Sequence, residues 1–400
     1  MRKISVLFMV LILLLVVACD EPAGDTKRIE QLDLNTYLES VEMPKNLSIT
    51  FDSTKVSTVT SAKKYTATFL ELDPDTVAKE LLRNDITEQK PMAEGLYFIA
   101  KSSSMDEYLT VLDGGRSFGV KGATNGGLSY MVIKDGDQNK PELIANTIGP
   151  PNTTEQFFRS MRRSDYSSSA NLSFACYAEA LASVEHLMSS IGLSKLKLVE
   201  SYAMDLKTMK EHYNYYLEEM MNEEEVKSYD FTVEDESYRF YFRQQIDELP
   251  VNSTIWFLGK GTAEGAAGNV MSNNPILTVT YQKDGVNNIS ARHFFDIPKA
   301  KSGEPESLIS AVDAMKILLK EYKDLILEEG TKVSSAELLY VSVPVKGKEE
   351  EAIFDLIPAW VFTITKPQYA NDKGIGNYQS DDYGQYVVNA ITGDKLSGMR

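Results

Sequence analysis

Hydrophobic and polar positions alternate most regularly over residues 305–396. Apolar side chains recur every three or four positions across residues 308–327, which predicts an amphipathic helix. Gly330 is expected to end this helix, because glycine readily adopts the left-handed conformation of a helix terminus. Alternating runs predict three strands after it, at residues 333–345, 357–365 and 385–396. The pattern therefore predicts a helix packed on a sheet.

A less regular version of this order occurs at residues 173–251. Apolar residues from Tyr177 to Ile191 fall at helical spacing, and Gly192 is a suitable stop for that helix. Three further elements are expected to follow: a strand at residues 195–203, an inserted helix rich in Tyr and Met at residues 204–221, and an aromatic strand at residues 237–246.

A first unit is expected at residues 45–150. Asp73 can cap a helix, and Pro74 suits its first turn. Asp113-Gly114-Gly115 resembles a hairpin turn between strands at residues 108–112 and 117–120. Other strands are predicted at residues 47–51, 65–70 and 128–133.

These patterns predict an α+β fold class, made of repeated units of an amphipathic helix packed on a mostly antiparallel sheet. Pro150-Pro151 is a natural boundary, because consecutive prolines interrupt both helix and sheet. The expected organisation is a signal peptide at 1–18, a lipidated tether at 19–44, an N-terminal α+β unit at 45–150, a middle α+β unit at 151–300 and a C-terminal α+β unit at 301–400.

The N-terminus has the pattern of an export signal. Arg2 and Lys3 precede an unbroken apolar run of 13 residues, Val6 to Ala18. A membrane-spanning helix needs about 20 apolar residues, so this run is typical of a signal peptide instead. The run ends in Val16-Val17-Ala18-Cys19, which resembles the lipobox of bacterial lipoproteins. The alternative is an ordinary signal peptide in which Cys19 is incidental.

The lipobox resemblance implies a modification and a location. Cys19 would carry a thioether-linked diacylglycerol, with acyl chains such as palmitate, and would become the mature N-terminus. Two acyl chains form a stable membrane anchor. The expected location is the extracytoplasmic face of the cell membrane, with the protein bound to the membrane through its N-terminal diacylglycerol.

The net charge argues against a nucleic-acid partner, and the cysteine content argues against an internal disulfide. The net charge is −17, and it becomes −19 when Arg2 and Lys3 leave with the signal peptide. Such a surface repels phosphate backbones, so no nucleic-acid partner is expected. Cys176 is the only cysteine after Cys19, so no internal disulfide can form, and its apolar surroundings in sequence favour a small buried side chain.

No metal, cofactor or catalytic residue is predicted. The three histidines, His186, His212 and His293, have no partner at ligand spacing and are expected at surface or half-buried positions. Asp135, Asp137 and Asn139 begin like a calcium loop, but Lys140 replaces the required glycine. Two further candidates are weak: Ser61-Ala62-Lys63-Lys64 does not open a helix, and the glycines at 259, 261, 265 and 268 lack phosphate-loop spacing.

The acidic insertion at residues 204–236 is a candidate interaction surface. Its glutamates, including Glu218, Glu219, Glu234 and Glu236, are expected to form a solvated face. The tyrosines and methionines beside them suit either a protein partner or packing onto the neighbouring sheet.

Two segments resemble PepSY-type domains and the related YycH- and YycI-type extracytoplasmic regulators of sensor kinases in Gram-positive bacteria. The first is Tyr238-Arg239-Phe240-Tyr241-Phe242-Arg243, running on to Glu248-Leu249-Pro250-Val251. The second contains Pro358-Ala359-Trp360-Val361-Phe362 and the closing Val388-Asn389-Ala390-Ile391-Thr392-Gly393-Asp394. The likeness covers residues 170–400, most clearly 305–396. It implies a non-catalytic module that binds or restrains an envelope protein.

The sequence therefore predicts a lipid-anchored, extracytoplasmic lipoprotein that is not an enzyme and that binds or regulates a protein of the cell envelope. The alternative is a lipoprotein that binds a peptide or glycan and serves a transporter. A ligand-induced rise in melting temperature would favour the alternative.

Overall fold

The computed structural model describes residues 33–92, 95–112, 116–117, 120–121, 126–135, 155–157, 163–220, 229–252, 277–345, 353–372 and 376–396. The chain divides into two compact units, residues 1–41 and residues 42–400. In the first unit, helix α2 (Leu34–Ser40) begins after Asp33, whose carboxylate accepts a hydrogen bond from Thr36 N at 3.3 Å. The predicted signal peptide and Cys19 lie outside the described residues. Among the helices that are described, none has both the length and the apolar character needed to cross a membrane.

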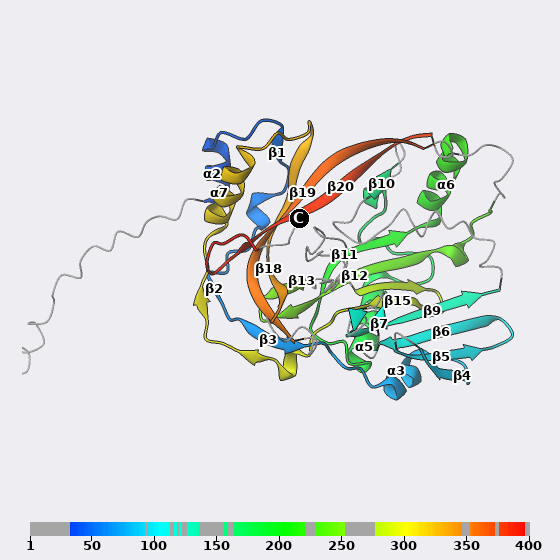
Figure 1. The fold of residues 1–400 in the computed structure, drawn as a ribbon. Helices are drawn as coiled ribbons and strands as arrows, with labels where there is room; N and C mark the ends of the chain where they lie inside the picture. Colours follow the sequence, from blue (N-terminus) through cyan, green and yellow to red (C-terminus); the bar gives the residue numbers. More distant parts are fainter. Residues whose placement is uncertain are drawn as a thin grey trace, which may run out of the picture. The chain divides into compact units, whose positions relative to one another are not determined.

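One antiparallel array occupies half of the second unit. Strands from the predicted N-terminal unit and from the predicted middle unit form two adjacent blocks within it, which meet where β9 is hydrogen-bonded to β15 (Figure 1). The spatial order is β4 (Ile86–Pro91), β5 (Gly95–Lys101), β6 (Met105–Leu112), β9 (Gly127–Lys134), β15 (Gly285–Ala291), β14 (Leu277–Gln282), β12 (Ser237–Ile246) and β11 (Leu196–Met204).

The C-terminal strands form the other half. Long strands β18 (Thr331–Pro344), β19 (Ile353–Asp372) and β20 (Gly376–Asn389) pair antiparallel in that order, and β10 (Glu155–Phe157) adds to β20. Strands β1 (Leu47–Ile49) and β13 (Leu249–Asn252) run parallel to β18. Strand β3 (Tyr65–Thr68) pairs with β19, and β16 (Lys301–Ser302) pairs with β3.

A tight hairpin between β12 and β13 connects the two halves, with Ile246 opposite Leu249. Through it, 16 described strands form one connected sheet. Two short pairs lie apart from it: β2 (Ser61–Ala62) with β17 (Glu306–Ser307), and β7 (Arg116–Ser117) with β8 (Val120–Lys121). Short 3₁₀ helices occur at Ser53–Lys55, Arg163–Asp165, Val233–Asp235 and Ile297–Lys299.

The predicted α+β class of repeated helix-on-sheet units is wrong. The fold is dominated by one large mixed sheet, which contains parallel as well as antiparallel pairs and strands from all three expected units. The physical reason is that an exposed strand edge offers unpaired N–H and C=O groups, and here those groups pair with strands distant in sequence. The boundaries expected at 150 and 300 stay predictions.

Helices α3 (Pro74–Leu81) and α5 (Tyr177–Ser190) pack against the same apolar core of the antiparallel half. On β12, Tyr238, Phe240 and Phe242 face this core. Local sequence explains the helix ends: Asp73 caps α3, and Gly192, which follows α5, has φ of +92°. Burying such aromatic side chains contributes about 2–3 kcal/mol each.

Helix α7 (Ala311–Tyr322) is shorter than predicted. It begins after Ser310, whose hydroxyl accepts a hydrogen bond from Asp313 N at 3.1 Å. It ends at Tyr322 rather than at Gly330, which instead has φ of +83° in the turn before β18. The helix packs on the sheet as expected, since the rings of Tyr322 and Tyr386 lie 5.9 Å apart.

Two turns contain a glycine with positive φ, Gly285 at +110° and Gly393 at +78°. Gly285 follows Asp284 in the β14–β15 hairpin, and Asn389 N and Gly393 N close the turn near the C-terminus. The hairpin turn predicted at residues 113–115 lies outside the described residues; of the described strands on either side, β6 pairs with β5 and β9, and β7 pairs with β8.

Candidate functional site

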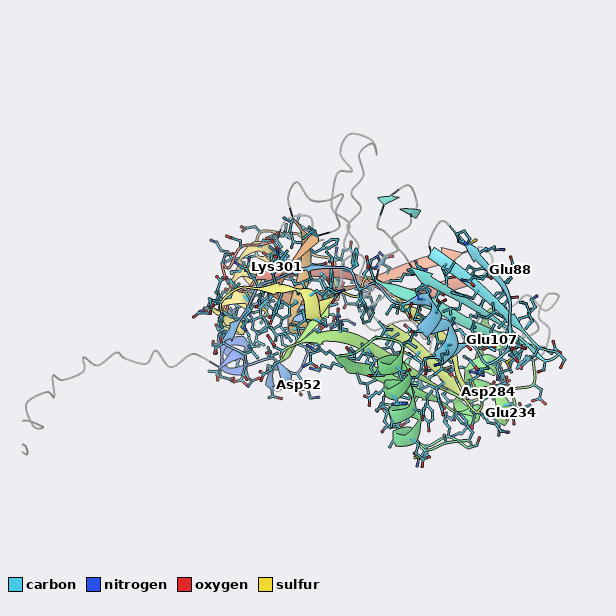
Figure 2. The ribbon with its side chains drawn as sticks, turned by 90° about the horizontal axis from the view of Figure 1, so that it is seen from below. Asp52, Glu88, Glu107, Glu234, Asp284 and Lys301 are labelled. Carbon is cyan, nitrogen blue, oxygen red and sulfur yellow. The ribbon has the colours of Figure 1, made fainter. Side chains whose placement is uncertain are left out.

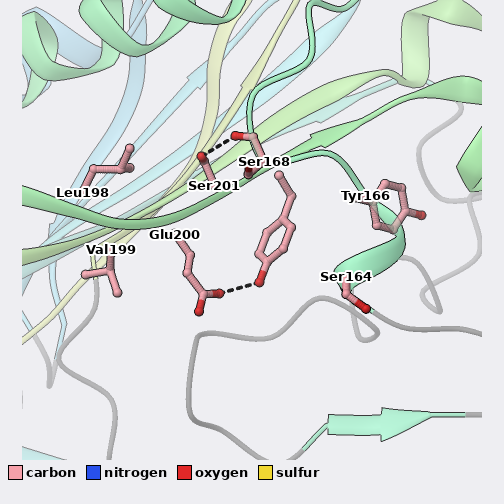
Figure 3. A pocket seen from close by; sticks show the side chains of 8 residues that line it. Ser164, Tyr166, Ser168, Leu198, Val199, Glu200 and Ser201 are labelled. Carbon is pink, nitrogen blue, oxygen red and sulfur yellow. Dashed lines mark hydrogen bonds between the residues drawn. The ribbon is translucent and has the colours of Figure 1, made fainter. Parts of the chain in front are cut away.

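A pocket of about 460 Å³ lies at the outer edge of β11 (Figure 3). Strand β11 forms one wall, and the segment that follows the 3₁₀ helix at Arg163–Asp165 forms the other. The described lining residues are Ser164, Tyr166, Ser168, Leu198, Val199, Glu200, Ser201 and Tyr202. Two of the residues are tyrosines and three are serines, so the pocket combines aromatic surface with hydroxyl groups.

Backbone groups of β11 point toward the pocket. Along an antiparallel strand, successive residues direct their N–H and C=O groups to opposite edges. Ala203 N donates outward to Ser167 O at 2.8 Å, and Lys195 O accepts from Gln245 N on the β12 side at 2.7 Å. The register of β11 with β12 shifts between Leu198 and Glu200, so Val199 is an extra residue in this alternation. Counting forward from Lys195, which faces β12, Leu198 faces outward, and counting back from Ala203, Ser201 faces outward as well. In the described part of the chain, no backbone hydrogen bond reaches either residue on that edge.

A β-bulge reshapes the strand beside the pocket. The register with β12 shifts between Leu198, opposite Phe242, and Glu200, opposite Tyr241, so Val199 is an extra residue. Figure 3 shows the side chains of Val199 and Glu200 on the same side of β11. Two neighbouring side chains therefore line one wall, where regular alternation would supply one.

Hydrogen bonds hold the polar groups of the wall in place. Ser201 Oγ donates to Ser168 O at 2.7 Å and lies 2.8 Å from Tyr177 Oη on α5. On the other face of β11, the Tyr202 hydroxyl donates to a carboxylate oxygen of Glu200. The ring of Tyr202 packs edge-on against Tyr241, with centroids 5.9 Å apart. The Glu200 carboxylate is thus oriented by a side chain that is itself packed.

Tyr166 forms the inner wall and is 4% exposed. Burial, with a smaller contribution from the Asp205 charge, raises the pKa of its hydroxyl far above the usual value. That hydroxyl has no hydrogen-bond partner among the described residues. The ring packs with Tyr202, Met204, Met209 and Tyr241 in a small separate core.

Behind Tyr166 lies a histidine–carboxylate pair. His212 Nε2 lies 3.0 Å from Asp165 Oδ2, and the imidazole packs edge-on against Tyr166 at 4.9 Å. The expectation of surface or half-buried histidines is correct for His186, which is exposed, whereas His212 and His293 are buried. His212 supports the pocket wall through Tyr166 and is not a lining residue.

Helix α6 (Leu206–Met220) is anchored by Glu236, which is 7% exposed. Its carboxylate accepts hydrogen bonds from Leu206 N at 3.2 Å, from Ser173 N at 3.0 Å and from the Ser173 hydroxyl. Glu236 therefore differs from the solvated face expected for the acidic insertion, whereas Glu234 is exposed and pairs with Lys283. The insertion does contain a helix, and its Met209 and Tyr213 are buried.

A second polar cluster surrounds Glu107, which is fully buried. Its carboxylate accepts hydrogen bonds from Arg83 N, Asn84 N, Asn84 Nδ2 and Tyr130 Oη, at 2.7–3.2 Å. Figure 2 places Asp284 near it, where the guanidinium of Arg83 and the ammonium of Lys134 both pair with Asp284. Since the carboxylate is already surrounded by donors, we assign this cluster to structure.

Several sequence candidates lie elsewhere or outside the described residues. Cys19, Asp137, Asn139 and the glycines at 259, 261, 265 and 268 are outside. Cys176 is half-buried at the N-terminus of α5, and Ser61 lies in the short strand β2. Within the described parts of the chain, no three His, Cys, Asp and Glu side chains gather as metal ligands. The pocket was not predicted, because it depends on the bulge and on which strand lies at the sheet edge.

No family model matches the sequence, and no curated protein matches it. The fold is similar to the crystal structure of an uncharacterized protein from Eubacterium rectale ATCC 33656. The two chains share 15% sequence identity with a TM-score of 0.50, and the alignment covers 84% of this chain and 86% of the other. At this identity the similarity supports the fold alone. The resemblance to PepSY-, YycH- and YycI-type domains stays a prediction.

Proposed function

We propose that this protein is a lipid-anchored, extracytoplasmic binding protein of the cell envelope, which engages a partner protein at the β11 pocket. The observation that carries the proposal is the pocket itself, which joins two tyrosine rings and several hydroxyls to a strand edge that no described residue closes at Leu198 and Ser201. Aromatic residues are enriched at protein interfaces, and an open edge accepts further backbone hydrogen bonds.

The role proposed is binding and not catalysis. Ser201, which could be considered a nucleophile, donates its hydroxyl to a carbonyl oxygen, and neither of its two described hydrogen-bond partners, Ser168 O and Tyr177 Oη, is a base. The buried His212 is paired with Asp165 behind the inner wall. These contacts favour a fixed surface for recognition over an activated nucleophile.

Photo-crosslinking in cells tests the proposal. Benzoylphenylalanine at Ser164, an exposed residue of the pocket rim, should give a discrete crosslinked protein in the membrane fraction. The matched control places the same group at Glu304, an exposed residue between β16 and β17, and should not give that product. Absence of a product at Ser164, with the protein abundant and folded, would overturn the proposal.

The anchor has its own test. A Cys19→Ser variant should leave the membrane fraction and should be insensitive to inhibition of signal peptidase II, because it lacks the acylated sulfur. Continued membrane association of that variant would contradict the lipid anchor without affecting the pocket.

A second candidate is a lipoprotein that binds a small peptide or glycan for a transporter. The supporting observation is the volume of about 460 Å³, within the range of roughly 300–1,000 Å³ that is typical of ligand sites. A ligand of this kind would raise the melting temperature of the purified protein without any crosslinked protein at Ser164.

A further inference from the structure

We infer that the β11 pocket receives an extended polypeptide segment, which adds to β11 as a further strand and places a Lys or Arg side chain against Glu200. This inference rests on the proposed binding function and specifies the chemistry of the partner. It combines three observations: the orientation of the β11 backbone, the side chains that the bulge brings to the pocket, and the charge of its surroundings.

The protein's own chain already begins such an outer strand. Ser167 forms an antiparallel bridge with Ala203, but the segment then turns away, and Ala170 N donates to Ser167 Oγ at 3.0 Å instead of continuing along β11. Ser168 O still lies beside β11, where it accepts a hydrogen bond from Ser201 Oγ at 2.7 Å, but the described residues make no backbone hydrogen bond to the outward groups of Leu198 and Ser201. A peptide strand placed there would extend the ladder that Ser167 starts, in the manner of β-strand addition.

Side chains of an added strand alternate between the two sheet faces. Those on one face would meet Leu198 and Ser201, next to α5, and those on the other would meet Glu200 and Tyr202. The pocket lies on the second face, bounded by Tyr166 and by the bulged Val199. One side chain of the incoming segment would therefore enter the pocket while the backbone pairs with β11.

Charge selects the identity of that side chain. Glu200 is the only charged residue among the described lining residues, and Asp165 and Asp205 lie beside Tyr166. Among the described side chains, the opposing positive charges are Arg239, on β12 near Tyr166, and Lys197, which is exposed at the start of β11. The Tyr202 hydroxyl occupies one carboxylate oxygen of Glu200, and the carboxylate retains sites for further donors. A cationic side chain that also contacts the tyrosine rings suits this arrangement.

Selection from a displayed library of random nine-residue peptides tests the inference on the full mature chain. The wild type should enrich peptides with a Lys or Arg in an otherwise extended sequence. Glu200→Lys should shift the enrichment toward Asp and Glu, and Glu200→Gln, which keeps an acceptor for Tyr202, should weaken the preference for basic residues. The matched control, Glu304→Lys, should select the same peptides as the wild type.

One selected peptide and its derivatives then separate backbone from side-chain recognition. Replacing its basic residue by norleucine, or methylating alternate backbone nitrogens, should each reduce affinity at least tenfold in fluorescence anisotropy. The inference is overturned if no peptide is enriched, if enrichment is indifferent to Glu200→Lys, or if N-methylation has no effect. Any of these three results can be obtained while benzoylphenylalanine at position 164 still crosslinks a partner protein in cells. In that case the proposed function stands and the strand-addition inference fails.

Discussion

At the scale of single residues, buried carboxylates organise this protein. Glu107 is fully buried, and it accepts hydrogen bonds from two backbone amides after α3 and from Tyr130 on β9. A buried acceptor of this kind fixes the position of every donor around it, because each donor left without a partner is costly. Glu107 therefore locks the end of α3 onto the antiparallel half of the sheet.

Replacing Glu107 by Ala should lower the free energy of unfolding by about 2–4 kcal/mol, since several buried donors lose their acceptor together. Urea denaturation of the purified protein measures this loss. Glu80→Ala on the exposed face of α3 is the control and should change stability by less than about 0.5 kcal/mol. Equal effects of the two substitutions would contradict the structural role of Glu107.

Asp284 should make stability depend on pH. Burial opposes its ionisation, but the hydrogen bond and charge of Lys134, together with the charge of Arg83, outweigh it and hold the pKa of the carboxyl below its usual value. Because the folded pKa is lower than the unfolded value of about 3.9, the ionised group stabilises the fold above about pH 5. This contribution is lost as the pH falls through the folded pKa.

The expected result is that Asp284→Asn flattens the decline in the free energy of unfolding between about pH 5 and pH 3. Urea denaturation at several pH values provides the measurement. The exposed control Glu304→Gln should leave the decline unchanged, and an unaltered slope in Asp284→Asn would refute this role.

At the scale of elements, helices and strands lie where the sequence predicted them when the buried positions follow the local hydrophobic pattern. Strand β12 and helix α5 lie where the alternation predicted them, because their apolar faces meet the same core. The pattern failed at the end of α7, where Leu325 is 51% exposed and Ile326 is fully exposed. An apolar stripe shows which face can be buried, but it does not show that a neighbour is present to bury it.

Glu236 links two elements near the pocket, helix α6 and the segment at Ser173. Glu236→Ala should increase amide hydrogen exchange in the first turn of α6 and lower stability by about 1–3 kcal/mol, because Leu206 N and Ser173 N lose their buried acceptor. Exchange followed by mass spectrometry resolves the peptide concerned. Glu234→Ala, two positions away and exposed, is the matched control; a similar change there would count against a specific anchor.

At the scale of the whole molecule, the sequence predicted strands but not which strands would pair. The pairing of β9 with β15 joins segments more than 150 residues apart, and short-range alternation contains no information about such partners. The candidate pocket was missed for the same reason, because Leu196–Met204 becomes an edge only after all other pairings are formed. The likeness between residues 173–251 and 305–396 suggested repeated helix-on-sheet units, but the strands of both segments belong to one sheet.

This connectivity predicts that a fragment of residues 301–400 will not fold alone. Its strands β18 and β19 pair with β1, β3 and β13, all of which lie outside the fragment. The fragment should lack dispersed NMR resonances and a cooperative thermal transition, whereas residues 42–400 should show both. A cooperatively folded fragment would instead support the boundary expected at residue 300.

The pairing of β1 with β18 also determines when folding can finish. Leu47–Ile49 lies against Thr331–Val333, so one of the first strands to be synthesised waits for one of the last. Pairings of such sequence separation slow folding and leave apolar strand edges uncovered in the meantime. A chain with this topology needs protection from aggregation until nearly all of it has been synthesised. We therefore expect its folding to depend on chaperones.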